Sequence, residues 1–169
     1  RVKATAMEKF SAPLLRKTAL TADVYQFDFG WGEKPVDFKA GQFFMMEVVD
    51  EAGKVNRSYS VSSTPSFREG FSLCVKLLPN GRGSKLLRDL QVGQTANFMA
   101  AFGHFVLADS PKDMLMISTG TGLAPFISMV PAVFERGFSG KVTLIFGVRH
   151  EEDLFYVDQL REWEKAHAN

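Results

Sequence analysis

Short stretches of alternating or continuous apolar residues, separated by turn residues, make up the first two-thirds of the chain. Over residues 24–29, three aromatic side chains fall on one face of an extended chain and two polar side chains fall on the other. This period of two is typical of a half-buried strand. Further strands are predicted over residues 41–49, 55–62, 71–78 and 95–101, with a loop at 30–35 and a hairpin turn at 51–54. Strands repeated at such short spacing predict an antiparallel barrel or sandwich.

The pattern changes after residues 108–111. Apolar strands predicted over 114–117 and 142–146 alternate with helices predicted over 123–136 and 156–166. Strands that are apolar on both faces and alternate with helices indicate a parallel, doubly wound α/β sheet. We therefore expect a β domain over residues 1–108 and an α/β domain over residues 111–169. Because two strands make a small sheet and domains usually exceed about 50 residues, we expect the second domain to be truncated, with its N-terminal part present.

Composition excludes several classes of protein. With 20 Lys and Arg against 19 Asp and Glu, the chain lacks the excess positive charge that favours binding to nucleic acid or to a membrane surface. No apolar run approaches the roughly 18 residues of a membrane span. The single cysteine, Cys74, precludes an internal disulfide and fits a reducing, cytoplasmic location. The three histidines lack the spacing of metal ligands, so no metal site is expected.

The first candidate binding segment is Arg57-Ser58-Tyr59-Ser60, inside a predicted strand. Arg57 and Tyr59 share one face of the strand, and Ser58 and Ser60 share the other. A guanidinium can clamp a phosphate through several donors, and a tyrosine ring suits stacking on a large heteroaromatic group. An ordinary strand with one solvent-exposed face is the alternative interpretation.

The second segment is a glycine-rich turn that leads into a short helix predicted over residues 84–90. Gly81, Arg82 and Gly83 precede Ser84, which is predicted to be the N-cap of the helix. Free N–H groups and the helix dipole favour an anion at such a start, and glycines let a ligand approach the backbone closely. An ordinary loop with a helix cap is the alternative.

The third segment joins the first apolar strand of the α/β region to the following helix, which is the context of a dinucleotide-binding turn. It contains Gly120, Thr121 and Gly122, with Pro125 where the third glycine of that turn usually lies. Proline fits the first turn of a helix because the N–H that it lacks has no partner there. A tight turn without a ligand is the alternative.

Two basic residues extend these candidates. Arg149 follows the second apolar strand, where the ribose end of a nucleotide would lie, and a 2′-phosphate contact there slightly favours NADP over NAD. Lys76, near the end of the strand over 71–78, is a further candidate for cofactor contact. A solvated surface cation is the alternative for both.

In order and spacing, these segments strongly resemble the signatures of the ferredoxin–NADP reductase family. The family motifs R-x-Y-S, G-x-x-S, G-x-F, G-T-G-x-A-P and G-x-R are matched by Arg57–Ser60, Gly81–Ser84, Gly103–Phe105, Gly120–Pro125 and Gly147–Arg149. Each motif alone is weak, whereas five in the same order are specific. The resemblance covers residues 10 to 160, nearly the whole chain.

The resemblance implies an antiparallel Greek-key β-barrel that holds FAD, followed by a nucleotide-binding α/β domain for NADP(H) or NAD(H). It implies that Arg57 contacts the FAD pyrophosphate, that Tyr59 stacks on the isoalloxazine, and that Ser60 lies near flavin N5, where hydride arrives. Gly81, Gly83 and Ser84 would seat the pyrophosphate. Gly120, Thr121 and Gly122 would approach the nicotinamide nucleotide, and Pro125 would fix the next helix. The other cofactor-binding candidates are Ser58, Lys76, Arg82 and Arg149.

The resemblance further implies a flavin-dependent oxidoreductase that moves electrons between NAD(P)H and a one-electron carrier, such as ferredoxin, flavodoxin or another redox protein. A non-enzymatic, flavin-binding electron-transfer subunit of a larger complex is the alternative. FAD is preferred to FMN through the resemblance alone. The family continues with further strands and a terminal aromatic residue, so FAD binding is expected of this chain more firmly than oxidation of NAD(P)H.

Overall fold

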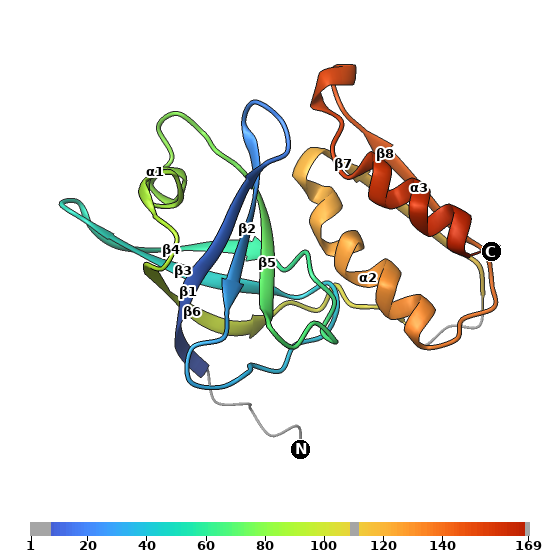
Figure 1. Ribbon diagram of the computed structural model, residues 1–169, viewed down its shortest axis with the longest axis horizontal. Helices are drawn as coiled ribbons and strands as arrows, with labels where there is room; N and C mark the ends of the chain where they lie inside the picture. The colour runs from blue at the N-terminus through green and yellow to red at the C-terminus, as the bar shows by residue number, and fades with distance from the viewer. Residues whose placement is uncertain (1–7, 109–111, 168–169) are drawn as a thin grey trace.

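The computed structural model describes residues 8–108 and 112–167, which form a β-barrel region and an α/β region (Figure 1). The barrel region contains β1 (Glu8–Ala19), β2 (Val24–Gly30), β3 (Phe43–Asp50), β4 (Gly53–Ser60), β5 (Gly70–Lys76), α1 (Arg82–Asp89) and β6 (Thr95–Phe102). The α/β region contains β7 (Met114–Thr119), the 3-10 helix η1 (Gly120–Leu123), α2 (Ala124–Glu135), β8 (Val142–Gly147), the 3-10 helix η2 (Glu151–Asp153) and α3 (Val157–Ala166). None of the helices in these ranges is long and apolar enough to cross a membrane.

The six strands of the barrel region form one antiparallel sheet in the order β4-β3-β6-β1-β2-β5. The sheet curls until its two edge strands meet, because Val61, just after β4, bridges Leu73 of β5. Nearby, the Ser62 N–H donates to the Ser72 carbonyl at 2.8 Å. Such curling reduces the number of unpaired strand edges. The expected antiparallel Greek-key barrel is confirmed as this curled sheet.

Strand β1 lies outside the strands that the sequence pattern predicts. Its first half pairs with β6 and its second half pairs with β2. An irregularity in the pairing between Leu14 and Arg16 separates the two halves. A bulge of this kind interrupts the alternation of buried and exposed side chains, so the period-two pattern that reveals the other strands is weak here.

Aromatic side chains fill the core of the barrel. Phe71, which is fully buried, packs edge-on against Phe44 and Phe98 with ring centroids 4.9 and 5.1 Å apart. It also stacks on Phe29 at 5.4 Å. Burying one such side chain stabilises a fold by about 1.5–3 kcal/mol, and edge-on aromatic pairs add to this. These contacts join β2, β3, β5 and β6 through one aromatic core.

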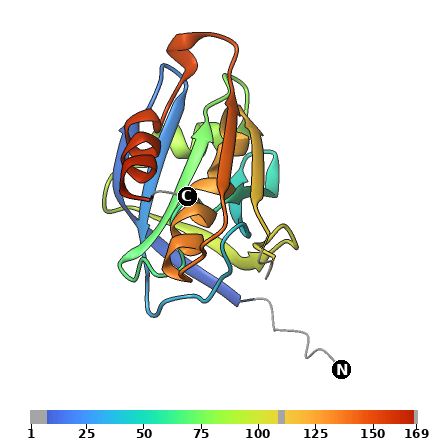
Figure 2. The same cartoon turned by 90° about the vertical axis from the view of Figure 1, so that its right-hand side faces the viewer.

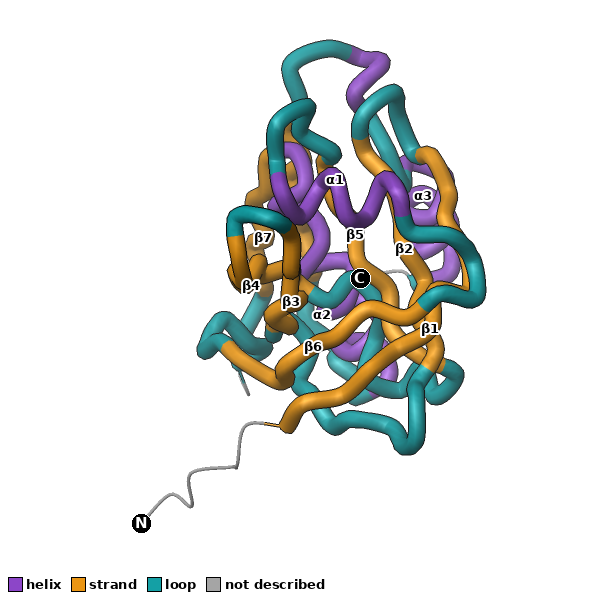
Figure 3. The backbone as a smooth tube through the Cα atoms, turned by 90° about the vertical axis from the view of Figure 1, so that its left-hand side faces the viewer, coloured by secondary structure: helices purple, strands orange, loops and turns teal. Residues whose placement is uncertain are grey.

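Helix α1 lies over the barrel (Figure 3), and hydrogen bonds to other segments hold both of its ends. At its start, Arg82 Nε and Nη2 donate to the Asp50 carboxylate at 2.6 and 2.5 Å. At its end, the Lys17 ammonium donates to the carbonyls of Leu87 and Arg88 at 3.1 and 2.7 Å, an arrangement that also suits the helix dipole. The hairpin between β3 and β4 and strand β1 thus fix the helix from opposite ends.

The prediction that Ser84 caps this helix was wrong. The helix begins at Arg82 with Gly81 as its N-cap, and Ser84 lies within the first turn. Its hydroxyl accepts a hydrogen bond from the Leu78 N–H at 2.9 Å. The loop before the helix folds back over the first turn, so a backbone donor of that loop occupies the serine oxygen.

Helix α2 lies between the barrel and the parallel pair β7–β8 (Figure 1), and Figure 2 shows these two strands side by side. The Ser128 hydroxyl of α2 donates to the Ser63 carbonyl at 2.6 Å, and the apolar face of the helix packs against Val24 and Cys74 of the barrel. The predicted parallel strands alternating with helices are confirmed, and α2 and α3 lie on the same face of the strand pair, where both line one groove with β8. On the opposite face of this sheet, three apolar side chains are more than half exposed: Leu115, Ile117 and Ile145.

Gly41 lies where the barrel meets the segment that leads to α2. Its φ is +98°, and an added Cβ would lie 2.1 Å from the Phe105 carbonyl oxygen and 2.2 Å from Met129 Cε. We expect Gly41→Ala to lower the free energy of unfolding by about 3 kcal/mol, because left-handed strain and a backbone clash add together. Denaturant titration would measure this loss.

Gly93→Ala is the matched control. Gly93 also has a positive φ, +90°, but an added Cβ would meet nothing within 4 Å. We expect a loss of about 1–2 kcal/mol from backbone strain alone. Equal losses for the two variants would contradict the proposed role of Gly41 as a close-approach position.

Candidate functional site

The side chains of Arg57 and Tyr59 lie against the start of helix α1. A Cβ built on Gly83 would lie 2.4 Å from Tyr59 Oη and 3.1 Å from Arg57 Cγ. A residue with a side chain would therefore displace the phenol. Glycine lets β4 and the helix approach closely, and the structure brings together two segments that are distant in sequence.

Tyr59 is half-buried beside this helix, and Arg57 is exposed. Burial raises the pKa of the Tyr59 phenol above its ordinary value, while the Arg57 guanidinium acts in the opposite direction. The phenol therefore remains protonated at neutral pH and can donate a hydrogen bond. On the other face of β4, Ser58 is exposed and Ser60 is half-buried, opposite Met45 and Phe43 of β3.

The first backbone N–H groups of α1 have no capping side chain, because the N-cap residue is a glycine. Gly81 makes no side-chain capping hydrogen bond, and the first turn holds no acidic residue. Such an end carries partial positive charge. Three of the predicted binding side chains here make hydrogen bonds within the protein: Arg82 pairs with Asp50, Ser84 accepts from Leu78, and Arg57 Nη1 donates to the Asn56 carbonyl at 3.0 Å. The hydrogen bond from Arg82 lowers the pKa of the Asp50 carboxyl below its ordinary value.

A cleft of about 700 Å³ lies between the barrel and the α/β region. Four residues predicted from the sequence line it together, namely Lys76, Gly120, Thr121 and Arg149. Other lining residues were not predicted as site residues, among them Asp23, Val24, Leu78, Thr119, Asp153 and Phe155. The Lys76 ammonium pairs with the Asp23 carboxylate at 2.7 Å, and both side chains remain partly exposed.

The glycine turn at the edge of this cleft is open. Added Cβ atoms at Gly120 and Gly122 would meet nothing within 4 Å, and Gly120 has a φ of +51°. Just before the turn, the buried hydroxyl of Ser118 has no hydrogen-bond partner, although buried polar groups are normally paired. Gly122 and Pro125 are not among the residues that line the cleft. Pro125 lies buried in the first turn of α2.

Ser118, Asp23 and Phe155 were not identified as site residues from the sequence. Ser118 directly precedes the glycine turn, and that position was the available signal. Asp23 and Phe155 come close to the turn only through tertiary packing, because one precedes β2 and the other precedes α3. No local pattern marks them.

The start of α1 and the cleft are connected by one loop. Leu78, which follows β5, lines the cleft. Its N–H donates to the Ser84 hydroxyl at 2.9 Å inside the first turn of α1. This hydrogen bond thus links a residue of the cleft wall to the helical turn that Arg57 and Tyr59 contact.

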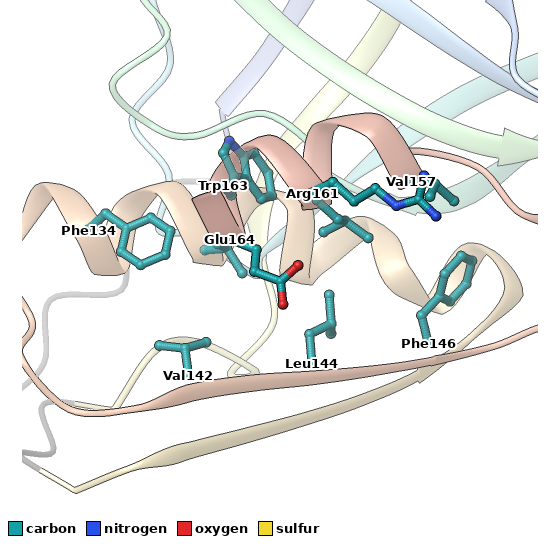
Figure 4. Close-up of a pocket in the computed structure, with 10 residues that line it drawn as sticks. Phe134, Val142, Leu144, Phe146, Val157, Arg161, Trp163 and Glu164 are labelled. Atoms are coloured by element: carbon teal, nitrogen blue, oxygen red, sulfur yellow. The ribbon is translucent and has the colours of Figure 1, made fainter. Parts of the chain in front are cut away.

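A second groove, of about 280 Å³, lies between α2, α3 and β8 (Figure 4). Val142, Leu144 and Phe146 of β8 face it from the sheet side, and Val157 and Trp163 face it from α3. Its lining contains none of the residues predicted from the sequence motifs. The mostly apolar lining is typical of helices packed on a sheet.

Comparison with protein families matches both regions of the chain. The oxidoreductase FAD-binding domain model matches residues 11–107. The oxidoreductase NAD-binding domain model matches residues 116–169. The first match covers more than half of the chain and coincides with the barrel region.

Two relatives show the same relationship in sequence. Ferredoxin–NADP reductase B of Sorangium cellulosum is 34% identical over 155 residues, which cover 90% of this chain and 64% of that protein. Reductase component 2 of terephthalate 1,2-dioxygenase from Comamonas sp. is 28% identical over 171 residues, covering 98% of this chain and 49% of that protein. The chain thus spans 64% and 49% of the lengths of these two relatives.

Solved structures share the fold. The Amycolatopsis cytochrome P450 reductase GcoB superposes with a TM-score of 0.87 at 27% identity, covering 96% of this chain and 50% of that protein. Ferredoxin–NADP reductase from Plasmodium falciparum superposes with a TM-score of 0.83 at 22% identity, covering 96% and 70%. The chain therefore belongs to the ferredoxin–NADP reductase family, with an oxidoreductase FAD-binding domain followed by oxidoreductase NAD-binding sequence.

Proposed function

We propose that the protein moves electrons between NAD(P)H and a one-electron carrier through FAD held on the barrel. One observation carries this proposal: Arg57 and Tyr59 meet Gly83 at the start of α1, one loop away from the glycine-lined cleft. Family membership and the printed activities of the relatives support the same assignment.

The residues at the start of α1 fit a flavin dinucleotide. The Arg57 guanidinium and the N–H groups of the first helical turn would hold the pyrophosphate, and Gly83 leaves their approach unobstructed. The Tyr59 ring would lie against the flavin ring, with Ser60 beside it near the reacting nitrogen. FAD supplies a ring that accepts two electrons as a hydride and can release them singly. The protein supplies alignment and hydrogen-bond donors.

The cleft fits a nicotinamide nucleotide. Gly120 and Thr121 would approach the nucleotide backbone, and Lys76 and Arg149 would supply positive charge. Arg149 is exposed at the rim, where a 2′-phosphate contact would favour NADP over NAD. We place the barrel domain at residues 1–108 and the nucleotide-binding part at 111–169. Ferredoxin, flavodoxin or another redox protein is the proposed electron partner.

An absorption spectrum tests the proposal directly. The purified protein, incubated with FAD and separated from free flavin, should show flavin bands in the visible range. Anaerobic NADPH should then bleach these bands, and an added one-electron acceptor should restore them. A colourless protein after incubation with FAD would refute the proposal, whereas retained flavin that NADPH fails to bleach would favour an electron-transfer subunit without reductase activity.

Arg57→Ala should weaken FAD binding by between about 10- and 100-fold, which corresponds to loss of charge-assisted hydrogen bonds to phosphate. Fluorescence titration with FAD would measure the dissociation constant. Arg68→Ala is the matched control, because Arg68 is an exposed arginine on the loop before β5. Unchanged FAD affinity in the Arg57 variant would remove this residue from its assigned role.

Arg149→Ala should discriminate between the two nicotinamide nucleotides. We expect the dissociation constant for NADP⁺ to rise about tenfold and that for NAD⁺ to change less than about twofold, since only NADP⁺ carries the 2′-phosphate. Arg161→Ala, in the groove between α2, α3 and β8, should change neither constant. Equal losses for both nucleotides would argue against a 2′-phosphate contact.

A further inference from the structure

Tyr156 joins the far wall of the cleft to the barrel. It precedes α3 with a left-handed backbone, φ 59°, directly after Phe155, which lines the cleft and is 4% exposed. The Tyr156 Oη donates a hydrogen bond to Gln26 Oε1 of β2 at 2.7 Å. The contact therefore spans the two regions that enclose the cleft.

Gln26 is held in place by a buried carboxylate. Its Nε2 donates to Asp28 Oδ1 at 2.7 Å, and the Ser72 hydroxyl donates to the same oxygen at 2.7 Å. Arg16 Nε donates to Asp28 Oδ2, also at 2.7 Å. Asp28 is only 7% exposed, and a carboxylate removed from water needs such donors. With its amide nitrogen committed to Asp28, Gln26 directs its oxygen towards Tyr156.

The conformation of Tyr156 is unfavourable by itself. A left-handed backbone is disfavoured for a residue that has a Cβ. The turn is supported by aromatic contacts, since the Phe155 ring lies 5.2 Å from that of Phe146 and 5.5 Å from that of Tyr156. Burial, with a smaller effect of Cys74 in the same direction, raises the pKa of the Tyr156 phenol above its ordinary value, while the Ser62 hydroxyl acts in the opposite direction. The phenol consequently stays protonated and remains a donor.

The anchor and the opposite wall of the cleft share one strand. Val24, which lines the cleft, and Gln26 are two residues apart on β2, so their side chains point to the same face about 7 Å apart. On the other side, Phe155 and Tyr156 are adjacent in sequence. The Tyr156–Gln26 hydrogen bond therefore joins close neighbours of Val24 and Phe155, which line opposite sides of the cleft.

We propose that Tyr156 is a positioning residue whose hydrogen bond to Gln26 sets the width of the cleft, and with it the affinity for a nicotinamide nucleotide. The nature of the ligand rests on the proposed function. The attachment of the segment 147–156 to the barrel does not rest on it.

Tyr156→Phe tests this inference in the FAD-loaded protein, with NADP⁺ as the probe. We expect the dissociation constant for NADP⁺, measured from the perturbation of the flavin spectrum, to rise about tenfold because a buried acceptor loses its donor. Flavin content should not change, since Tyr156 does not contribute to the start of α1. Amide hydrogen exchange over residues 147–156 should become faster in the absence of nucleotide.

Tyr25→Phe provides the matched control. Tyr25 is also half-buried on β2, and it packs with the barrel core rather than with α2. Its variant should leave both the NADP⁺ affinity and the exchange over 147–156 unchanged. A second test combines Tyr156→Phe with Gln26→Leu. The double variant should lose little more affinity than the more affected single variant, because the two side chains act as one unit.

The outcomes test separately whether Tyr156 anchors the segment 147–156 and whether this anchor affects nucleotide binding. Unchanged exchange in Tyr156→Phe would overturn the anchor, and faster exchange with unchanged NADP⁺ affinity would overturn its role in positioning. Strictly additive losses in the double variant would also overturn the coupling. If the wild-type protein binds FAD but no nucleotide, the nucleotide part of the proposed function fails, and the exchange measurement still decides whether Tyr156 holds the segment.

Discussion

The close approach of strand β4 to the first turn of α1 is the constraint on which the candidate site depends. It exists because Gly83 has no side chain, so that the phenol of Tyr59 and the stem of Arg57 can reach the helix. The helix cannot retreat from this contact, since Asp50 holds its start through Arg82 and Lys17 holds its end. The Arg82–Asp50 ion pair, being partly exposed, would contribute little to stability by itself, and the Lys17 ammonium makes hydrogen bonds to backbone carbonyls. At opposite ends of a short helix, however, the two contacts define its position.

The cleft has a different origin, because it lies between two regions with separate cores. The aromatic core of the barrel and the apolar cluster around α2 meet at Val24 and Cys74. Ser128 attaches α2 to the barrel, and Tyr156 attaches the segment that follows β8. A site between two regions is sensitive to small shifts in their separation, whereas the place where β4 meets α1 lies within one region. Flavin and nucleotide binding are thus expected to respond differently to the same substitution.

Much of this architecture could be predicted from the sequence, and the exceptions have physical reasons. The places of the strands with clear period-two or apolar patterns and the β-α-β-α alternation are confirmed. Strand β2 was predicted to be half-buried, but its polar face is covered as well, because Tyr156 contacts Gln26 and Asp28 is only 7% exposed. Strand β1 was missed because a bulge divides its pairing between two neighbours. Ser84 was misassigned as a cap because the competing donor, Leu78, arrives through a loop that folds back over the helix.

In the candidate site, too, local sequence patterns identified some residues, and tertiary contacts placed the others. Motif residues such as Gly83 and Gly120 lie at the positions where backbone approach or an open turn requires glycine, and their spacing in sequence was enough to find them. Asp23 and Phe155 reach the cleft, and Tyr156 reaches the barrel, through contacts between residues far apart in the chain, which no local pattern encodes. The Tyr156–Gln26 hydrogen bond, for example, joins residues 130 positions apart.

Cys74 offers a natural chemical reporter of movement between the two regions. It is 5% exposed at the junction with α2, and burial raises the pKa of its thiol to about 12. Nearly all of the thiol is therefore protonated at neutral pH and unreactive towards alkylating reagents while the junction stays closed. Because it is the one cysteine in the chain and also interacts with Tyr156, its rate of alkylation follows the opening of the junction between the barrel and the α/β region, without any label having to be engineered.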